Sequence, residues 1–466
     1  MRAKLVSVSA VVFAMGTLLS PGSAPAQFAN QVKVSDAIEG NPIPGLSAAR
    51  CGTNIVVGFA DAEGAAPGSR AGGPGFAVSN DGGQTFSDLG VLPDRSLRFG
   101  DDGGSNVIGC SSASTFYYAT RGFIETAEGP CIVGCTEISL SKSTDGGRSW
   151  SASIAASTGT SDNYDFHAPS LAVDPTNPNH MYIAYLNFNS APSDFSDCGG
   201  GEPESIILEF VSSSDGGKTW SGRANPAEFG TPSMELDHSC PNTGTDPARE
   251  GTLSSPNVLV SPGGKVYLTY AFTGTDPSTG LSTGKEIRFV RSLDAGKTFS
   301  APIKVSTDAV NNAAPRLGVD RTTDRSRGTI YLAWSGKPNG TATEVLMSES
   351  LDLGLSFSFP RPVRGTSQGT QINPVVAVDN DGQVATCYYV TGTNTPTSSS
   401  NYFYNCLTSF NHAATWTGYQ KLVTSAPAGY DSLTSDFLLR NDGFFTAFEV
   451  PTTGQRHVVG SKSDLN

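Results

Sequence analysis

Arginine, carboxylate, histidine and tyrosine side chains lie directly beside short apolar runs that recur along this chain. An arginine guanidinium binds a carboxylate through two parallel hydrogen bonds, so arginines that converge with polar groups suit an acidic sugar. Paired carboxylates, or a tyrosine assisted by a carboxylate, could then cleave a glycosidic bond. The candidates are Arg50, Asp101, Asp102, Asp165, His167, Arg249, Glu250, Asn312, Arg316, Gln371, Asn373, Tyr430, Asp431 and Asp436.

Each of these polar groups also has a purely structural interpretation. Strand ends that meet around a common centre are often capped by polar side chains or hold ordered water. His167, in the segment N-Y-D-F-H-A-P, is the best placed of the five histidines for chemistry, yet it too could serve packing alone. The segment D-N-D-G at 379–382 could form a calcium loop, or an ordinary turn between strands.

The apolar runs that would position these residues form a repeat of roughly 60 residues. An opening run such as A-P-S-L-A-V-D (168–174) is followed by an aromatic-rich run such as H-M-Y-I-A-Y-L (180–186). These β-branched and aromatic runs, bounded by Gly, Pro, Asn or Asp, predict strands. One copy is too small to bury its own apolar face, so the copies must pack side by side. The seven opening runs begin at residues 47, 105, 168, 255, 314, 373 and 434.

Most copies continue into a turn of the form S-x-D-x-G-x-T/S-W/F. The aspartate can accept hydrogen bonds from the turn's own amides, and the glycine can take a positive φ. A sixth copy at 409–416 is degraded, with Asn411 for Asp and Ala413 for Gly. The five intact copies begin at Ser79, Ser143, Ser213, Ser292 and Ser350, and their aspartates are Asp81, Asp145, Asp215, Asp294 and Asp352.

This turn resembles the Asp box of the sialidase-like (BNR-repeat) β-propellers. The resemblance covers essentially all of the chain after residue 26. It implies an all-β propeller in which the Asp boxes lie on outer hairpins, away from the central site. Their aspartates are therefore expected to be structural, not catalytic.

The number of repeats and the two chain ends predict seven blades. The last repeat stops at S-K-S-D (461–464), where another turn of this form would begin, and residues 27–35 read like the strand that follows such a turn. We therefore expect the last blade to combine three carboxyl-terminal strands with one amino-terminal strand, which closes the ring and removes free edges. A seven-bladed ring over residues 27–466 departs from true sialidases, which have six blades.

The resemblance also suggests roles for individual residues. Arg50 lies about where the family's first arginine belongs, Arg70 could match the second, and Arg249 and Arg316 could be the later arginines. Asp61, or Glu63, would have to replace the acid, since A-G-G-P-G-F (71–76) contains no Asp. Tyr430 with Glu250 is a possible nucleophile pair. Cys51 and Gly52 stand where the family has Ile and Pro, so the likeness in fold exceeds the likeness in site.

Three functions are open at this point. The first is an exported glycoside hydrolase that acts on an acidic sugar, with Asp61, Asp165, His167, Glu250 and Tyr430 as catalytic candidates. The second is a non-catalytic propeller that binds a glycan or a protein. The third is a polysaccharide lyase with His167 or Tyr430 as base and Arg316 neutralising a uronate. None of these requires a cofactor or a metal, and none is expected.

The first 26 residues have the layout of a secretory signal peptide. Arg2 and Lys4 precede an apolar stretch from Val6 to Leu19, and A-P-A at 24–26 provides small residues for cleavage. The apolar stretch is short and wrongly flanked for a membrane span, so we expect an exported protein that is not inserted in a membrane, and an uncleaved anchor is the alternative. Loss of Arg2 and Lys4 changes the net charge from −13 to −15. Such a charge argues against nucleic-acid binding, in which Lys and Arg neutralise phosphates.

All eight cysteines follow the predicted signal, as expected in a compartment where disulfides form. Their positions in the repeat favour the pairs Cys51–Cys110, Cys131–Cys135, Cys198–Cys240 and Cys387–Cys406. Metal binding is the alternative for C-I-V-G-C (131–135), although no histidine lies nearby in the sequence.

Overall fold

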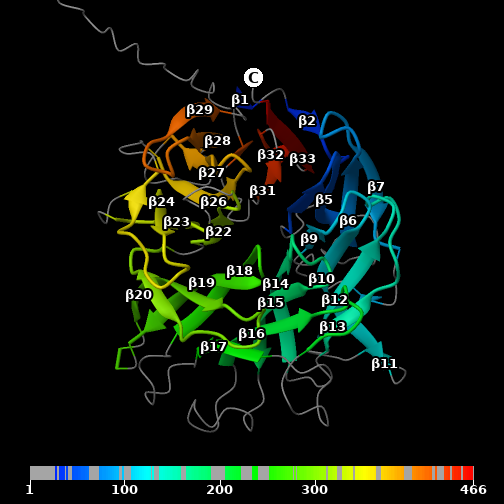
Figure 1. Ribbon diagram of the computed structural model, residues 1–466, viewed down its shortest axis with the longest axis horizontal. Helices are drawn as coiled ribbons and strands as arrows, with labels where there is room; N and C mark the ends of the chain where they lie inside the picture. Colours follow the sequence, from blue (N-terminus) through cyan, green and yellow to red (C-terminus); the bar gives the residue numbers. More distant parts are fainter. Residues whose placement is uncertain are drawn as a thin grey trace, which may run out of the picture.

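The computed structural model contains seven antiparallel sheets arranged as a ring around a central axis (Figure 1). The described residues contain no helix, so none of them forms a helix long and apolar enough to cross a membrane. The all-β, seven-bladed prediction is confirmed. The structure describes residues 27–28, 31–36, 38–39, 45–61, 73–93, 97–98, 106–126, 129–130, 136–158, 164–189, 205–221, 234–239, 251–276, 278–279, 281–310, 313–322, 328–338, 342–363, 369–392, 401–421, 426–427, 435–440, 443–452 and 455–464.

The predicted opening runs form the innermost strand of each blade. Each inner strand lies against the next, and the last lies against the first, so the ring is closed. In chain order they are β4 (Ser47–Cys51), β9 (Val107–Cys110), β14 (Tyr164–Val173), β18 (Gly251–Ser261), β22 (Arg316–Val319), β26 (Gln371–Val378) and β31 (Ser435–Arg440).

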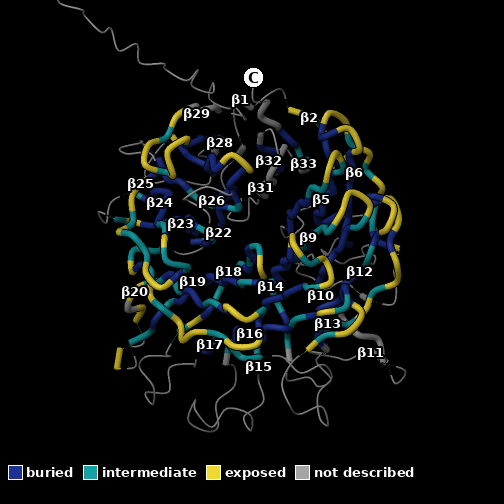
Figure 2. Tube along the Cα trace, in the orientation of Figure 1, coloured by how far each residue is buried: buried dark blue, intermediate teal, exposed yellow. Residues whose placement is uncertain are grey.

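The aromatic-rich second runs form the next strand outward and carry most of the core. Their side chains are buried on both faces, because each blade is covered by a neighbour on either side (Figure 2). These strands are β5 (Asn54–Asp61), β10 (Phe116–Thr126), β15 (Met181–Asn189), β19 (Lys265–Thr275), β23 (Ile330–Gly336), β27 (Val384–Thr391) and β32 (Gly443–Thr452).

A third and an outer strand complete each blade. The third strands are β6 (Gly73–Ser79), β12 (Thr136–Ser143), β16 (Ser205–Ser213), β20 (Ser282–Ser292), β24 (Glu344–Ser350), β28 (Asn401–Ser409) and β33 (Gln455–Asp464). The outer strands of blades one to six are β7 (Ser87–Val91), β13 (Ile154–Thr158), β17 (Met234–Ser239), β21 (Ile303–Ser306), β25 (Arg361–Pro362) and β29 (Thr417–Lys421). Short β8 (Leu97–Arg98) and β11 (Gly129–Pro130) add to blade two, and β30 (Ala426–Pro427) adds to blade six.

The seventh blade takes its outer edge from the amino-terminal segment. Three short pieces pair in succession with β33: β1 (Gln27–Phe28), β2 (Val32–Lys33) and β3 (Ile38–Glu39). In Figure 1 the blue amino-terminal β2 lies beside the red β33. The predicted closure of the last blade by both chain ends is therefore confirmed.

The S-x-D-x-G turns lie between the third and outer strands, far from the central axis. In blade three, one oxygen of Asp215 accepts the backbone N–H groups of Lys218 and Thr219, at 3.0 and 2.9 Å, and the other accepts the Thr219 hydroxyl at 2.6 Å. The Ser213 hydroxyl donates to Asp215 and accepts from the backbone N–H of Gly217. The same pattern recurs in the other intact copies, so these aspartates are occupied in holding their own turns.

Two disulfides lie within the described residues. Cys51–Cys110 joins the ends of the inner strands of blades one and two, and Cys387–Cys406 joins neighbouring strands of blade six. Both pairings agree with the prediction. The predicted pairs Cys131–Cys135 and Cys198–Cys240 lie outside the described residues.

Candidate functional site

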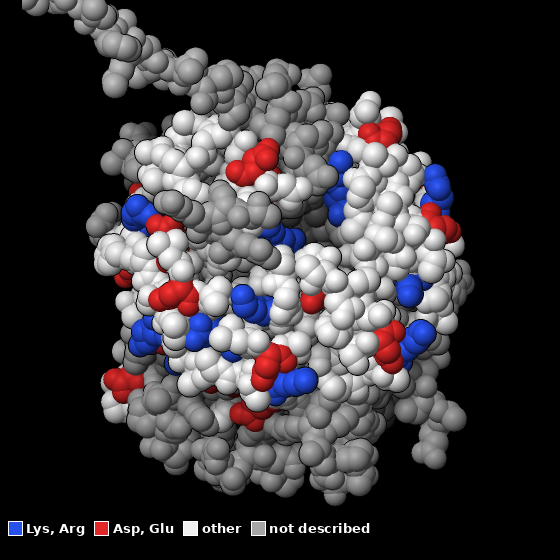
Figure 3. All heavy atoms as spheres, in the orientation of Figure 1, with Lys and Arg blue, Asp and Glu red and all other residues white. Residues whose placement is uncertain are grey.

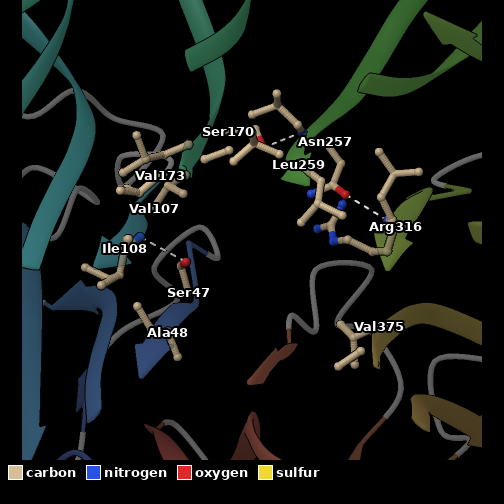
Figure 4. A pocket seen from close by; sticks show the side chains of 18 of the residues that line it. Ser47, Ala48, Val107, Ile108, Ser170, Val173, Asn257, Leu259, Arg316 and Val375 are labelled. Carbon is tan, nitrogen blue, oxygen red and sulfur yellow. Dashed lines mark hydrogen bonds between the residues drawn. The ribbon is translucent and has the colours of Figure 1, made fainter. Parts of the chain in front are cut away.

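A channel of about 480 Å³ runs along the central axis and is lined by the inner strands of blades one to six. Its described walls are mainly aliphatic, with Val107, Val173, Leu259 and Val375 among them (Figure 4). The space-filling view shows the hollow at the centre of one face, with lysine or arginine side chains at its edge (Figure 3). Arg50, Arg316 and Arg321 contribute the charged groups of the described lining.

A repeated kink marks the start of the channel wall in four blades. Ala168, Ser255, Ala314 and Asn373 have φ values of 49, 54, 44 and 51°, and each precedes a proline. In blades three, four and six the pairing with the second strand shifts register at this point, as in a β-bulge. The residue after the proline therefore begins the straight part of the wall, and the residues before it lie at the rim.

In three blades, the side chain at the position after the proline, or at its equivalent in blade one, accepts a backbone hydrogen bond from the next blade. The Ser170 hydroxyl accepts the backbone N–H of Val258 at 2.9 Å, and Asn257 accepts that of Leu317 at 2.9 Å. In blade one, Ser47 does the same for Ile108 at 3.0 Å. In blades three and four the donor lies one residue beyond the counterpart of the acceptor, so neighbouring inner strands run in the same direction with a constant offset.

Arg316 occupies this position in blade five. Its side chain lines the channel and extends toward Leu259 and Asn257 of blade four (Figure 4). One guanidinium nitrogen donates to the Pro315 carbonyl at 3.2 Å, which holds the group near the kink. A cation therefore lies at the mouth of the channel, on the side of the kinked residues.

Asp165 and His167 lie just before the kink of blade three, on the same rim as Arg316. His167 Nε2 is 2.8 Å from Asp165 Oδ2, and Arg121 from β10 donates to Asp165 Oδ1 at 2.5 Å. The Arg121 side chain is only 6% exposed, whereas those of Asp165 and His167 are 40% and 29% exposed. The three residues thus form a chain from a buried cation to a solvent-accessible imidazole.

This chain keeps Asp165 ionised. Burial opposes ionisation, but the hydrogen bond with His167 and the charge of Arg121 together lower the pKa of Asp165 below its ordinary value. An ionised Asp165 favours the His167 tautomer that carries its proton on Nε2, which makes Nδ1 the basic nitrogen. The edge of the His167 ring also packs against Phe188, with ring centroids 4.7 Å apart.

Arg121 was missed by the sequence analysis. It ends the run T-F-Y-Y-A-T-R (115–121), which is otherwise a buried core strand. A permanent charge at the end of such a strand requires a partner, and this signal could have paired it with a rim carboxylate.

A second polar network lies between blades three and four and was also missed. Asp237 accepts from Tyr270 at 2.6 Å and from Arg288 at 3.0 Å, and Arg288 also donates to Glu286 at 3.0 Å. Arg288 stacks over Phe272 at 3.6 Å from the ring centroid. Burial, then the charge of Asp237, raise the pKa of Tyr270 well above its ordinary value. The network serves to join the two blades.

The remaining predicted residues divide into three groups. Asp61 ends β5 on the same rim and is buried. Arg50 lines the channel three residues after Ser47, whereas Arg316 is at the position equivalent to Ser47, so the two arginines lie toward opposite ends of the wall. Of the other predicted site residues, Arg70, Arg249, Glu250 and Tyr430 lie outside the described residues, as do Glu63, Asp101, Asp102, Asn312 and Asp431.

Polar residues of blade six have structural roles. The Gln371 side chain is fully buried and accepts the backbone N–H of Val345 at 2.9 Å, and Asn373 is the kinked residue before Pro374. The D-N-D-G segment forms a turn in which Asp379 accepts the N–H groups of Asp381 and Gln383. Nothing within the described part of blade six gathers three potential metal ligands.

Comparison with solved structures supports the fold. An ulvan lyase of polysaccharide lyase family 25 superposes with a TM-score of 0.55 at 11% identity, over 92% of this chain and 95% of that one. The same kind of lyase bound to -[GlcA(1-4)Rha3S]- gives 0.53 at 11% identity, over 93% and 95%. A Hadza microbial sialidase, Hz136, gives 0.49 at 13% identity, over 84% and 74%. No protein-family model and no curated protein matches the sequence.

Proposed function

We propose that this protein is a carbohydrate-active β-propeller that cleaves an acidic polysaccharide by β-elimination. The observation that carries this proposal is the Arg121–Asp165–His167 chain on the same rim as Arg316. An imidazole beside an ionised carboxylate is suited to accept a proton, and an arginine is suited to neutralise a uronate. The fold shared with the ulvan lyases is consistent with this assignment but carries no residue roles.

The reaction would use the two groups in one step. Arg316 binds the uronate carboxylate and stabilises negative charge as it develops there. His167 Nδ1 removes the proton on the carbon next to that carboxylate, and the electron pair of the C–H bond forms a carbon–carbon double bond. The bond to the glycosidic oxygen at the neighbouring carbon breaks, and the leaving oxygen takes a proton from the imidazolium. Asp165 stabilises the imidazolium while it exists, and Arg121 holds Asp165 in place.

Hydrolysis of an acidic sugar is the second candidate, and one observation favours it. Asp61 is a carboxylate buried at the same rim, a position suited to the acid of a glycosidase. In this candidate Asp61 would be the acid, Tyr430 with Glu250 the nucleophile pair, and Arg70 and Arg249 further substrate-binding groups. Asp165 is a poor acid in either scheme, because its lowered pKa keeps it charged.

Assays of glucuronan, ulvan, alginate, pectate and sialoside substrates separate the candidates. Elimination creates a double bond conjugated with the carboxylate, which absorbs in the near ultraviolet, whereas hydrolysis releases a reducing end or an aglycone without that absorbance. We expect ultraviolet absorbance to rise with the unmodified protein on at least one uronide. Binding of a glycan without either product would replace the enzyme proposal with a binding function.

The variants His167→Ala and Arg316→Ala test the assignment. Loss of a general base costs about 100- to 10,000-fold in rate, so we expect His167→Ala to lower kcat at least 100-fold. Arg316→Ala should lower kcat/KM and remove discrimination between a uronide and its neutral analogue. His180→Ala is the matched control, because His180 lies in the turn at the opposite end of blade three. Equal activity of His167→Ala and His180→Ala would contradict the proposal.

Export of the mature chain is part of the same proposal. The disulfides Cys51–Cys110 and Cys387–Cys406 are compatible with an extracellular location. Residues 1–26, the predicted signal, lie outside the described residues. Amino-terminal sequencing of the secreted protein should begin at Gln27.

A further inference from the structure

A second cationic group faces the channel at the end away from Arg316. Arg321 follows the inner strand β22 and lines the channel. One of its terminal nitrogens donates to the Val260 carbonyl at 3.1 Å. Its Nε is buried and has no hydrogen-bond acceptor among the residues that the structure describes. Neither an aspartate nor a glutamate of the described residues forms an ion pair with it.

This arrangement is energetically costly for the protein alone. Burial lowers the pKa of Arg321, with the charge of Asp174 opposing the effect, yet an arginine remains protonated at neutral pH. A largely buried cation without a directly paired anion carries a desolvation penalty. A buried N–H without an acceptor adds to that penalty. An anion bound at Arg321 would offset both costs.

Arg50 brings a second guanidinium to the same level of the channel. Val260, which Arg321 contacts, lies three residues after Asn257, and Arg50 lies three residues after the equivalent Ser47. Both arginines line the channel, one from blade one and one from blade five. Arg50 is held by its Nε, which donates to the Gly52 carbonyl at 2.7 Å.

At this end of the channel, one oxygen of each nearby carboxylate accepts hydrogen bonds from its own turn. Asp174 Oδ1 accepts the N–H and the hydroxyl of Thr176, at 2.8 and 2.7 Å. Asp320 Oδ1 accepts the N–H of Thr322 at 2.8 Å. Asp174 acts on Arg321 through its charge without touching it, so the guanidinium keeps a donor for another acceptor.

We infer that the channel holds a second site, in which Arg321 binds a small oxyanion of the carboxylate or phosphate class. A planar guanidinium presents parallel N–H donors that match two oxygens of one such anion. This site is separate from the rim that carries His167 and Arg316. It does not depend on the function proposed for that rim.

Calorimetric titration of inorganic phosphate and of acetate into the unmodified protein tests the site, with chloride at equal ionic strength as reference. We expect saturable binding of an oxyanion that depends on Arg321, and weaker binding of chloride, which cannot accept from two N–H donors through two separate oxygens. An increase of Tm with phosphate concentration should accompany binding, because a ligand of the folded state stabilises it. Absence of saturable binding, or equal binding of chloride, would overturn the inference.

Two variants locate the site. Arg321→Met should abolish saturable oxyanion binding and the associated rise in Tm. Arg321→Lys keeps the charge but loses the two parallel N–H donors of the guanidinium, so it should weaken binding at least tenfold. Arg361→Met is the matched control, because it removes an exposed arginine from the outer strand β25 of the same blade, away from the channel, and should leave oxyanion binding unchanged. Retention of binding by Arg321→Met, or its loss in Arg361→Met, would also overturn the inference.

Discussion

Surroundings give chemically identical carboxylates opposite properties in this protein. The turn aspartate Asp215 accepts from the Thr219 hydroxyl and backbone N–H groups, which lower its pKa to about 2. Asp165 is also driven toward the charged form, by its neighbours His167 and Arg121. Asp379 is the opposite case, because burial raises its pKa to about 6 and the nearby charges of Asp381 and Asp320 add to the effect. Of these three pKa shifts, only that of the turn aspartate is predicted by a local sequence motif.

The raised pKa of Asp379 predicts a loss of stability as pH rises. Between the unfolded value of 3.8 and about 6, the folded protein keeps a proton that the unfolded chain has released. The free energy of unfolding therefore falls as pH rises through this window, by roughly 2–3 kcal/mol in total. Asp379→Asn keeps an oxygen for the N–H groups of Asp381 and Gln383 and removes the charge.

We therefore expect Asp379→Asn to be about 2 kcal/mol more stable than the unmodified protein at pH 8 and to lose that advantage at pH 4. Urea unfolding at pH 4, 5, 6 and 8 measures the difference. The same pH dependence in both proteins would show that Asp379 is ionised throughout the range.

The candidate site could be predicted only in part at this scale. Position beside an inner strand was enough to select Asp165, His167 and Arg316, because the repeat brings the same end of every inner strand to one rim. It also selected Arg50, which lies toward the other end, since the sequence does not give the length of the wall on either side of the kink. Arg121 was missed because it comes from a second strand, and only the three-dimensional packing brings it to Asp165.

At the scale of the element, the S-x-D-x-G turn joins neighbouring blades as well as shaping a hairpin. The sequence explains its glycines by positive φ, and the structure agrees, with φ of 77° at Gly216 and 85° at Gly217. The second glycine has a further role that local sequence cannot reveal. A Cβ at Gly217 would lie 2.5 Å from Leu140 of the preceding blade, and one at Gly147 would lie 2.3 Å from Val56.

Substitutions at two neighbouring glycines measure the cost of backbone strain separately from the cost of disturbed packing between blades. Gly216→Ala places a side chain at positive φ, with nothing closer than 3.6 Å, and should cost about 1 kcal/mol. Gly217→Ala adds a clash with Leu140, which is itself packed in the core, and should cost roughly 2–4 kcal/mol.

Denaturant unfolding of both variants gives the comparison. Blades four and five already carry Ala295 and Leu353 at the position of Gly216, with φ of 61 and 60°, so that site tolerates a side chain. Equal losses in the two variants would mean that the backbone alone sets the requirement for glycine. The degraded sixth copy has Ala413 at the position of Gly217, with φ of 60°, and its methyl group packs against the core of blades five and six.

At the scale of the whole molecule, the fold was predictable because repetition constrains it. Seven equivalent runs, none able to bury its own apolar face, require a closed assembly, and the incomplete last repeat requires a strand from the other chain end. The structure shows Val34 packed with Phe445 and Val458 of blade seven and with Leu46 of blade one. The amino-terminal segment thus belongs to two blades at once, and the ring depends on it.

Closure of the ring predicts that a few residues near the amino terminus control the stability of the whole protein. The side chain of Val34 is 2% exposed, and its backbone N–H donates to the Val458 carbonyl at 3.0 Å. Val34→Asn would bury an amide without a partner and remove apolar contacts, at a cost of roughly 3 kcal/mol or more. Lys33→Asn is the matched control, since the Lys33 side chain is 64% exposed and pairs with the exposed Asp36.

We expect Val34→Asn to lower Tm by several degrees and Lys33→Asn to leave it nearly unchanged, with thermal unfolding followed by circular dichroism. Because blade seven covers blades one and six, its loosening should also expose the fold to limited proteolysis at a lower temperature in Val34→Asn. Similar thermal unfolding of the two variants would mean that residues 31–36 contribute little to the stability of the protein. In that case blade seven would be stable without its outer strand, and the joining of the two chain ends would not hold the ring together.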